Sequence, residues 1–260
     1  MDDSFYVPLD ADGSRWRATV HTTGPWDAAF QHGGPPSALL GRALERCERR
    51  EDTVVARVTV ELLGPVPVAE LGLRVRVVRP GRSVELVEAA LSAAGRDVAR
   101  ASAWRVLRTA AAAVAPRHPG PPPLPAGTAP LERGAWVDGY LSAVEWRTVR
   151  GRFVEPGPGT AWTRLRHPLV AGEEPSPLQR VLAVADSGNG LSSELDLSRW
   201  HFINPELTVH LHREAVGEWI CLDASTAISP GGAGLATSVL SDAQGPVGVG
   251  AQALLVAPRP

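Results

Sequence analysis

The sequence VTVEL at residues 58–62 returns later in the chain as LTVHL at residues 207–211. The two stretches lie 149 positions apart, which is the step from Thr59 to Thr208, and the same step carries Val98 onto Val247 without a gap. The units of solenoid proteins are about 20–50 residues long. A period of this length therefore indicates a duplicated domain, and each copy should hold its own set of helix and strands.

The first copy combines one helix with a series of strands. The motif QHGGPP at residues 31–36 precedes a predicted helix that runs to about residue 49, and its proline suits a first helical turn. One face of this helix is apolar and the other carries Arg42 and further charged residues. Alternating apolar and polar residues then predict strands near 54–62, 71–78, 83–94 and 98–107. This alternation is typical of an antiparallel sheet with one buried face.

The second copy repeats the pattern after a stretch rich in proline and alanine. We expect strands at 143–153 and 160–167, a helix at 176–185, and strands near 207–212, 219–227, 234–241 and 247–256. One helix against one curled antiparallel sheet is an α+β arrangement. The predicted domains are residues 1–109 and 136–260, joined by a Pro/Ala-rich linker at 110–135.

Composition limits the classes of function. The 260 residues are 44% hydrophobic, which is enough for two cores, and the net charge of −2 gives no reason to expect nucleic acid or an anionic membrane as a partner. The two cysteines lie in different copies within apolar patterns, which favours buried free thiols. We find neither a signal-peptide pattern nor an apolar run long enough to span a membrane, so we expect a cytoplasmic protein.

Three polar residues of the second copy stand where apolar residues would be expected. Asp186 directly follows the apolar run VLAVA, Asn204 precedes a strand, and Gln252 lies inside the last strand beside Gly248 and Gly250. Each alone is well explained as a turn residue, a cap or a satisfied core amide. The bare glycines beside Gln252 suggest that another group approaches closely there. Together the three residues favour a functional site.

Several other sites fit the sequence less well. The Asp-Ser-Gly run at 186–188 matches the aspartic-protease loop, but that chemistry needs two carboxylates and the first copy lacks the motif. The chain has no G-x-S-x-G elbow of an α/β-hydrolase. His210 and His212 alternate on one strand without a third ligand, so we expect no metal site there.

The chain resembles the acyl-CoA thioesterase II family, whose members carry two hotdog domains in one chain. A hotdog domain is a long helix wrapped by a curled antiparallel sheet. The resemblance covers nearly the whole chain, and five motifs carry it: His32-Gly33-Gly34, Ala185-Asp186, Leu211-His212-Arg213, Gly217-Glu218-Trp219 and Gln252.

The resemblance implies a set of catalytic residues. In the family, an Asp, a Thr and a Gln of the second domain hold the attacking water, and these positions fall on Asp186, Asn204 and Gln252. Asn204 is a departure from the family's Thr. An asparagine can both donate to and accept from a water, so it can take the same role.

The chemistry of a thioesterase suits these residue types. Asp186 would be the general base, with a pKa raised if it is buried among apolar residues, and Asn204 and Gln252 would orient the water. Backbone N–H groups of Gly33 or Gly34, at a helix N-terminus, could stabilise the oxyanion, and His32 could contact the substrate. Arg213 and Arg79 are candidates for the phosphates of coenzyme A.

The predicted function is hydrolysis of an acyl-CoA or acyl-carrier thioester, in fatty acid metabolism, with no cofactor and no metal. Two alternatives stay open: a non-catalytic acyl-thioester-binding hotdog protein, and an acyl-CoA hydratase or dehydratase, which would use a histidine–carboxylate pair. We also expect the two sheets to pack side by side into a longer one, and the chain to form a homodimer.

Overall fold

The structure of the protein is a computed structural model that describes residues 3–110, 118–127, 139–153, 155–196 and 198–259. The expected linker at 110–135 lies partly outside these ranges, so the domain boundaries stay predictions. No helix in the described ranges is long and apolar enough to cross a membrane.

The first copy holds one long helix and six strands. In chain order they are β1 (Tyr6–Pro8), β2 (Arg15–Ala18), the 3₁₀ turn η1 (Val20–Thr22), α1 (Gly34–Arg46), β3 (Thr53–Leu62), β4 (Glu70–Arg79), β5 (Val84–Ala93) and β6 (Arg96–Leu107). Strands β3 to β6 lie close to the predicted positions, whereas β1 was not predicted. Helix α1 is shorter than predicted and ends at Arg46, because the backbone of Cys47 is already extended.

The second copy repeats this plan with two extra short helices. Its elements are α2 (Tyr140–Ala143), β7 (Val144–Arg150), β8 (Gly159–Leu165), α3 (Pro177–Ala185), α4 (Gly188–Leu191), β9 (Trp200–Ile203), β10 (Glu206–Leu211), β11 (Ile220–Ile228), β12 (Ala233–Asp242) and β13 (Gly245–Pro258). The Ser176 hydroxyl accepts a hydrogen bond from the Gln179 N–H and so caps the start of α3. Strand β9 was not predicted.

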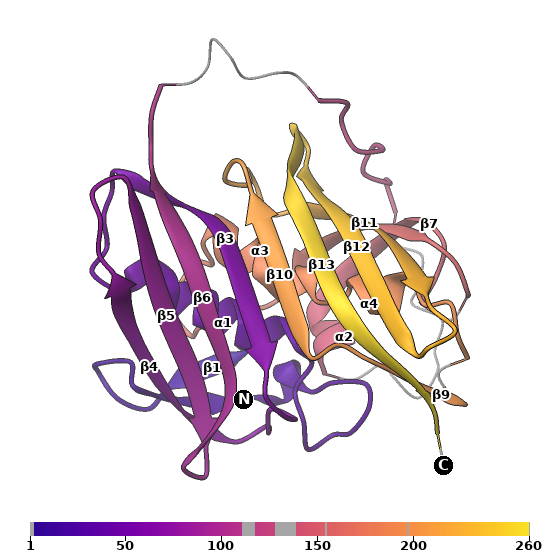
Figure 1. The fold of residues 1–260 in the computed structure, drawn as a ribbon, viewed down its shortest axis with the longest axis horizontal. Coiled ribbons are helices and arrows are strands. Elements are labelled where there is room, and N and C mark those ends of the chain that lie inside the picture. Colours follow the sequence, from indigo (N-terminus) through magenta and orange to yellow (C-terminus); the bar gives the residue numbers. More distant parts are fainter. Residues whose placement is uncertain (1–2, 111–117, 128–138, 154, 197, 260) are drawn as a thin grey trace.

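The strands of both copies form one continuous sheet, as predicted (Figure 1). Its order is β1-β2-β4-β5-β6-β3-β10-β13-β12-β11-β8-β7, and β9 pairs with the end of β13. The copies join where β3 pairs antiparallel with β10, and Thr59 stands directly opposite Thr208. These are equivalent positions of the repeat, and their hydroxyls lie 3.2 Å apart. A residue that faces its own counterpart marks a local two-fold axis between the copies.

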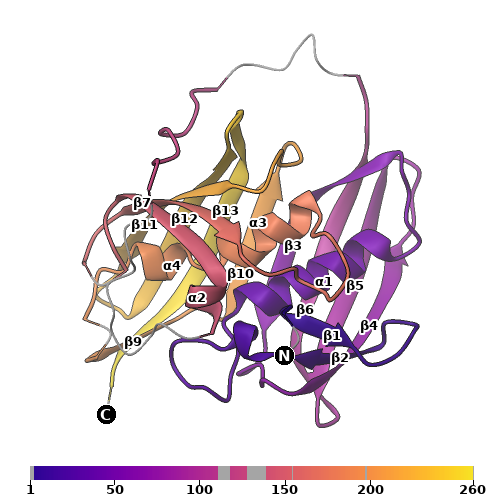
Figure 2. The same ribbon diagram turned by 180° about the vertical axis from the view of Figure 1, so that it is seen from behind.

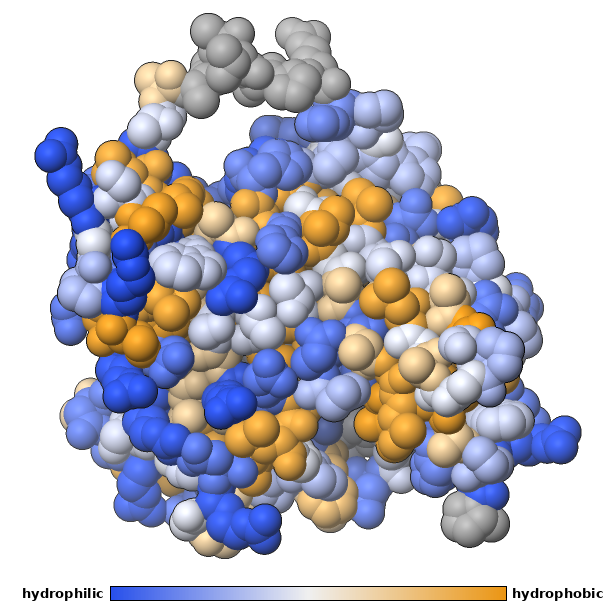
Figure 3. Space-filling view, viewed as in Figure 1, coloured by the Kyte–Doolittle hydropathy of each residue, from blue (hydrophilic) through white to orange (hydrophobic). Residues whose placement is uncertain are grey.

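Both long helices lie on the same side of this sheet (Figure 2). Helices α1 and α3 run antiparallel, so the start of α1 meets the end of α3. Their approach is close because Gly34 packs against the carbonyl of Ala183, and Gly41 packs against the side chain of Leu182. The opposite face of the sheet is exposed and mixes polar with apolar areas (Figure 3).

One residue of α1 departs from the predicted polar face. Arg42 is not solvated: it is only 9% exposed, and its guanidinium makes two hydrogen bonds to the carboxylate of Glu173, at 2.8 and 2.7 Å. It also lies over the ring of Trp16. Arg42 is buried because Glu173 of the second copy and Trp16 of the first cover this part of the helix, which a single amphipathic pattern cannot reveal.

Candidate active site

Asp186 lies where the two copies meet. It follows the last residue of α3, and its side chain faces the start of α1, where the Gly33 N–H donates a hydrogen bond to the carboxylate. Only 4% of Asp186 is exposed. A Cβ atom on Gly33 would come within 2.5 Å of Asp186 Oδ2, so glycine is what permits this approach. The antiparallel helix pair thus places a buried carboxylate against a helix N-terminus.

The other two residues of the predicted set converge on this carboxylate. Asn204, just after β9, donates from Nδ2 to Asp186 Oδ1 at 2.7 Å. Gln252, in the middle of β13, donates from Nε2 to the backbone oxygen of Asp186 at 3.0 Å and to its Oδ1 at 3.3 Å. The structure therefore brings Asp186, Asn204 and Gln252 together. Both amides contact the carboxylate itself, whereas the sequence suggested that they would orient a water.

Burial dominates the electrostatics of this carboxylate. Desolvation raises the pKa of Asp186 from its ordinary value of 3.8 to about 7, although the hydrogen bonds from Asn204, Gln252 and Gly33 each act to lower it. A carboxyl with a pKa near neutral pH can both accept and return a proton at that pH. This property suits a general base.

His32 completes the surroundings of Asp186. Its Nδ1 accepts a hydrogen bond from the Gly34 N–H at 3.0 Å and lies 3.5 Å from Asp186 Oδ2. Burial lowers the pKa of His32 to about 3, so the imidazole is neutral at pH 7 and its proton sits on Nε2. Its ring stacks on Tyr140 at 3.9 Å.

The first turn of α1 has few backbone donors. Pro35 and Pro36 carry no N–H, and the Ser37 N–H is bonded to the Gly33 oxygen. The N–H groups of Gly33 and Gly34 contact Asp186 and His32, respectively. A substrate oxygen would therefore compete with His32 Nδ1 for the Gly34 donor.

Two further residues hold the site together and were not singled out in the sequence. Asn189 donates from its backbone N–H to Gln252 Oε1 at 3.0 Å, and its side-chain amide lies 3.5 Å from Asn204 Oδ1. The buried Tyr140 hydroxyl donates to the Ala183 oxygen and shares a hydrogen bond with the Ser187 hydroxyl, each at 2.9 Å. The Asn189 position inside Gly188-Asn189-Gly190 was a usable turn signal, whereas nothing in the local sequence marks Tyr140.

Comparison with known families agrees with this architecture. The model for the acyl-CoA thioesterase N-terminal domain matches residues 22–106, and the model for the C-terminal domain matches residues 113–256. The chain belongs to the acyl-CoA thioesterase family. No curated protein matches it.

Solved structures share the double hotdog fold. A conserved protein of unknown function with a hot dog fold from Alicyclobacillus acidocaldarius superposes with a TM-score of 0.74 at 16% identity, over 100% of this chain and 97% of that one. Acyl-CoA thioesterase II of Mycobacterium marinum gives 0.67 at 15% identity, over 98% and 95%. The tesB protein of Mycobacterium avium subs paratuberculosis gives 0.67 at 18% identity, over 94% and 93%. At these identities the likeness shows the fold alone.

The sequence predicted that other groups approach closely at the glycines beside Gln252, and the structure shows such approaches at Gly248 and Gly250. A Cβ on Gly248 would overlap the backbone oxygen of His210, and one on Gly250 would come within 2.7 Å of the Ser238 hydroxyl. Strand β13 thus packs tightly against both neighbouring strands at the level of the site.

The two arginines suggested for coenzyme A phosphates have other contacts. Arg213 makes two hydrogen bonds to the fully buried carboxylate of Asp242, at 2.6 and 2.7 Å. Arg79 donates to the Val84 oxygen and lies over the ring of Trp104. Arg213 is therefore structural, because releasing it would leave a buried charge without its partner.

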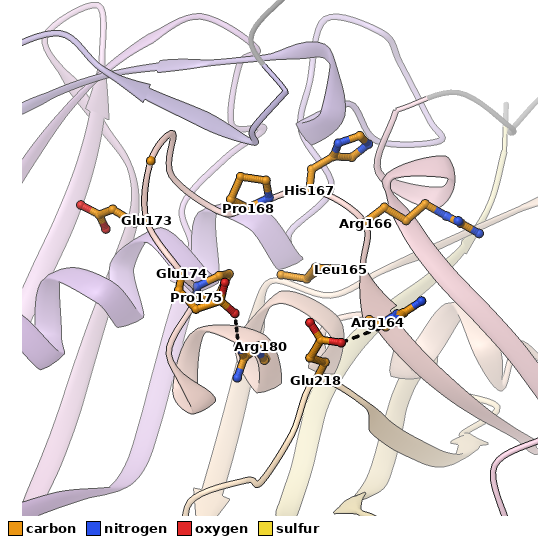
Figure 4. Close-up of a pocket in the computed structure, with 11 residues that line it drawn as sticks. Arg164, Leu165, Arg166, His167, Pro168, Glu173, Glu174, Pro175, Arg180 and Glu218 are labelled. Carbon is orange, nitrogen blue, oxygen red and sulfur yellow. Dashed lines mark hydrogen bonds and ion pairs between the residues drawn. The ribbon is translucent and has the colours of Figure 1, made fainter.

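A cavity of about 480 Å³ lies beside the junction, between the end of β8 and the start of α3 (Figure 4). Its walls carry both signs of charge, from Arg164, Arg166, Arg180, Glu174 and Glu218. Arg164 is paired with Glu218, and Arg180 with Glu174. None of the predicted site residues is among the described residues that line this cavity.

Proposed function

We propose that this member of the acyl-CoA thioesterase family hydrolyses an acyl thioester with a water activated by Asp186. One observation carries the proposal: a buried carboxylate with a pKa of about 7, held by Asn204 and Gln252 at the N-terminus of α1. A base with a pKa near the working pH is the most effective at that pH.

The geometry supports a simple sequence of proton movements. Asn204 and Gln252 both bind Oδ1, which turns Oδ2 toward the start of α1 and His32. Asp186 takes a proton from water as the water oxygen bonds to the thioester carbon, and the carbonyl oxygen becomes an oxyanion. The tetrahedral intermediate then breaks its carbon–sulfur bond, and Asp186 returns the proton to the leaving thiolate. The products are the free acid and the thiol.

The oxyanion requires a donor near Asp186. The Gly34 N–H is suited to this role because it lies at the positive end of α1. Its present acceptor, His32 Nδ1, belongs to a neutral ring, so a developing negative charge is the stronger acceptor. His32 would then form the wall of the substrate site, backed by Tyr140.

The substrate in this proposal is an acyl thioester of coenzyme A or of a carrier protein. The cytoplasmic location, the role in fatty acid metabolism and the homodimer stay predictions.

Free-thiol release from acyl-CoAs of short, medium and long chain tests the proposal directly. We expect turnover by the wild type and at least a 100-fold lower rate for Asp186→Asn, with Asp12→Asn as an exposed control that keeps full activity. Circular dichroism would confirm that each variant folds. A folded wild type that binds acyl-CoA but releases no thiol would contradict hydrolysis and leave a thioester-binding protein.

Hydration of an enoyl thioester is a second candidate, because one observation favours it. His32 Nδ1 and Asp186 Oδ2 lie 3.5 Å apart, which is the kind of pair that a hydratase uses. With enoyl-CoA, a hydratase would consume the conjugated double bond without releasing thiol, whereas a thioesterase would release thiol. Measuring the loss of the double bond and the release of thiol on the same enoyl-CoA decides between the two reactions. His32→Gln should abolish the hydration and leave the thiol release.

A further inference from the structure

The first residues of the described chain tie the two copies together. The Phe5 N–H donates to the Pro168 oxygen at 3.1 Å, and the Tyr6 N–H donates to the Leu169 oxygen at 2.9 Å, so this segment pairs with the loop after β8. On its other side, the Thr19 N–H donates to the Phe5 oxygen. Residues 4–6 are buried between the copies, and Asp3 stands where this anchored segment reaches the surface.

Three side chains from three separate segments meet at this point. Asp3 comes from the anchored segment, His21 from η1 in the first copy, and His167 from the loop after β8 in the second copy. His167 Nδ1 lies 2.6 Å from Asp3 Oδ1, and His21 Nε2 lies 3.9 Å from the same oxygen. The two imidazoles stack at 4.0 Å with an interplanar angle of 20°.

Hydrogen bonding alone explains this cluster poorly. His167 Nδ1 is a buried atom, and it makes no hydrogen bond with any described residue, although Asp3 Oδ1 is close. The carboxylate is therefore near the nitrogen but outside hydrogen-bonding geometry. An unpartnered nitrogen beside a carboxylate and a second imidazole is instead an arrangement that a cation would satisfy.

The three ligand atoms are close enough for one metal ion to reach all of them after side-chain movement. Bonds of about 2.0–2.2 Å place the ligand atoms of tetrahedral zinc about 3.4 Å apart. Here the three atoms all lie within 4.8 Å of one another, and the two distances to Asp3 Oδ1 fall on either side of 3.4 Å. Coordination therefore requires the two imidazoles to turn out of their stack and the 82%-exposed Asp3 side chain to move with them.

We propose that Asp3, His21 and His167 form a binding site for a divalent transition metal such as Zn²⁺, which clamps the anchored segment to both copies. Two imidazoles and one carboxylate are ligands that zinc accepts, and they leave a fourth position for water. His167 also borders the cavity of about 480 Å³ (Figure 4). The site is separate from Asp186 and requires no hydrolytic activity.

Titration calorimetry with Zn²⁺, on protein without a polyhistidine tag, tests this site. We expect one ion per chain, and at least about 100-fold weaker binding in His21→Gln and in His167→Gln, because loss of an outer partner alone costs about 10–100-fold. His210→Gln, at an exposed position of β10, should bind like the wild type. Zn²⁺ should also raise the melting temperature of the wild type and leave that of His167→Gln unchanged.

Two further measurements keep the proposal open to refutation. Asp3→Asn changes an exposed side chain, so this variant should fold normally. It should nevertheless bind Zn²⁺ more weakly than the wild type does. The absorption spectrum with Co²⁺ should show tetrahedral nitrogen and oxygen ligands. A thiolate charge-transfer band would place the metal on Cys47 or Cys221 instead, and this result would overturn the proposal, as would no saturable binding or equal binding by all variants.

Discussion

Asp186→Asn should remove activity and at the same time stabilise the fold at neutral and higher pH. The substitution keeps an oxygen for the donors Asn204 and Gln252, and it places an NH₂ group toward His32 Nδ1, which lies 3.5 Å from Asp186 Oδ2. The loss is limited to the hydrogen bond from the Gly33 N–H, worth about 1 kcal/mol at every pH.

The magnitude follows from the pKa of Asp186. Burial raises it from 3.8 to about 7, and each pH unit between the folded and unfolded values corresponds to about 1.4 kcal/mol. Because the folded pKa is the higher one, the penalty for ionisation is absent below pH 4, grows as the pH rises, and reaches about 4 kcal/mol above pH 7. Between pH 5 and pH 8 the variant should therefore gain about 2–3 kcal/mol relative to the wild type.

Urea unfolding of both proteins at pH 5, 6, 7 and 8, followed by circular dichroism, measures this difference. In the difference between the two proteins, the contributions of all other titrating groups to the pH dependence of stability cancel.

The pH dependence of the rate gives a parallel test. The kcat/KM of the wild type should rise about tenfold per pH unit below pH 7 and level off above it, because the base must be ionised. A stability difference that stays constant from pH 5 to pH 8 would refute the raised pKa, and with it the assignment of Asp186 as the base.

Three other substitutions probe the surroundings of the site. Asn204→Ala removes a hydrogen bond that lowers the pKa of Asp186, so the inflection of the pH–rate profile should move above pH 7; an unchanged inflection would show that this bond is weak. Gly34→Ala places a methyl group against a backbone carbonyl of α3 and should lower the free energy of unfolding in urea by about 2–4 kcal/mol. An unchanged free energy of unfolding would show that the two helices can move apart to accommodate the methyl group. Arg42→Met removes the two hydrogen bonds from Arg42 to Glu173 and leaves Glu173 with only part of its ion pairing. The melting temperature should fall by an amount that corresponds to a loss of about 1–3 kcal/mol in the free energy of unfolding. An unchanged melting temperature would mean that this ion pair does not stabilise the protein.

The duplication and most elements could be predicted from local pattern. Strands β3 and β10 alternate with period two, and α1 has one apolar face, so their positions follow from side-chain spacing along a single segment. Strand β9 was missed because its four residues are too few to show a period, and it exists only by pairing with the end of β13.

The candidate site was predicted only in part. The resemblance to a family pointed to Asp186, Asn204 and Gln252, and burial of Asp186 after an apolar helix was a fair expectation. The sequence could not show that both amides bind the carboxylate itself, because this depends on the direction of two side chains from separate segments, the residue after β9 and the middle of β13.

The sequence by itself determined the repeated α+β plan, since periodicity and turn residues act over a few positions of one segment. The tertiary structure alone decided which groups meet between the copies. The burial of Arg42, the stacking of His32 on Tyr140, and the meeting of His21 with His167 join residues more than 100 positions apart. Those contacts arise because glycines let α1 and α3 pack closely and because β3 pairs with β10. The side-chain period of a single element predicts neither the distance between the two helices nor the register between the two strands.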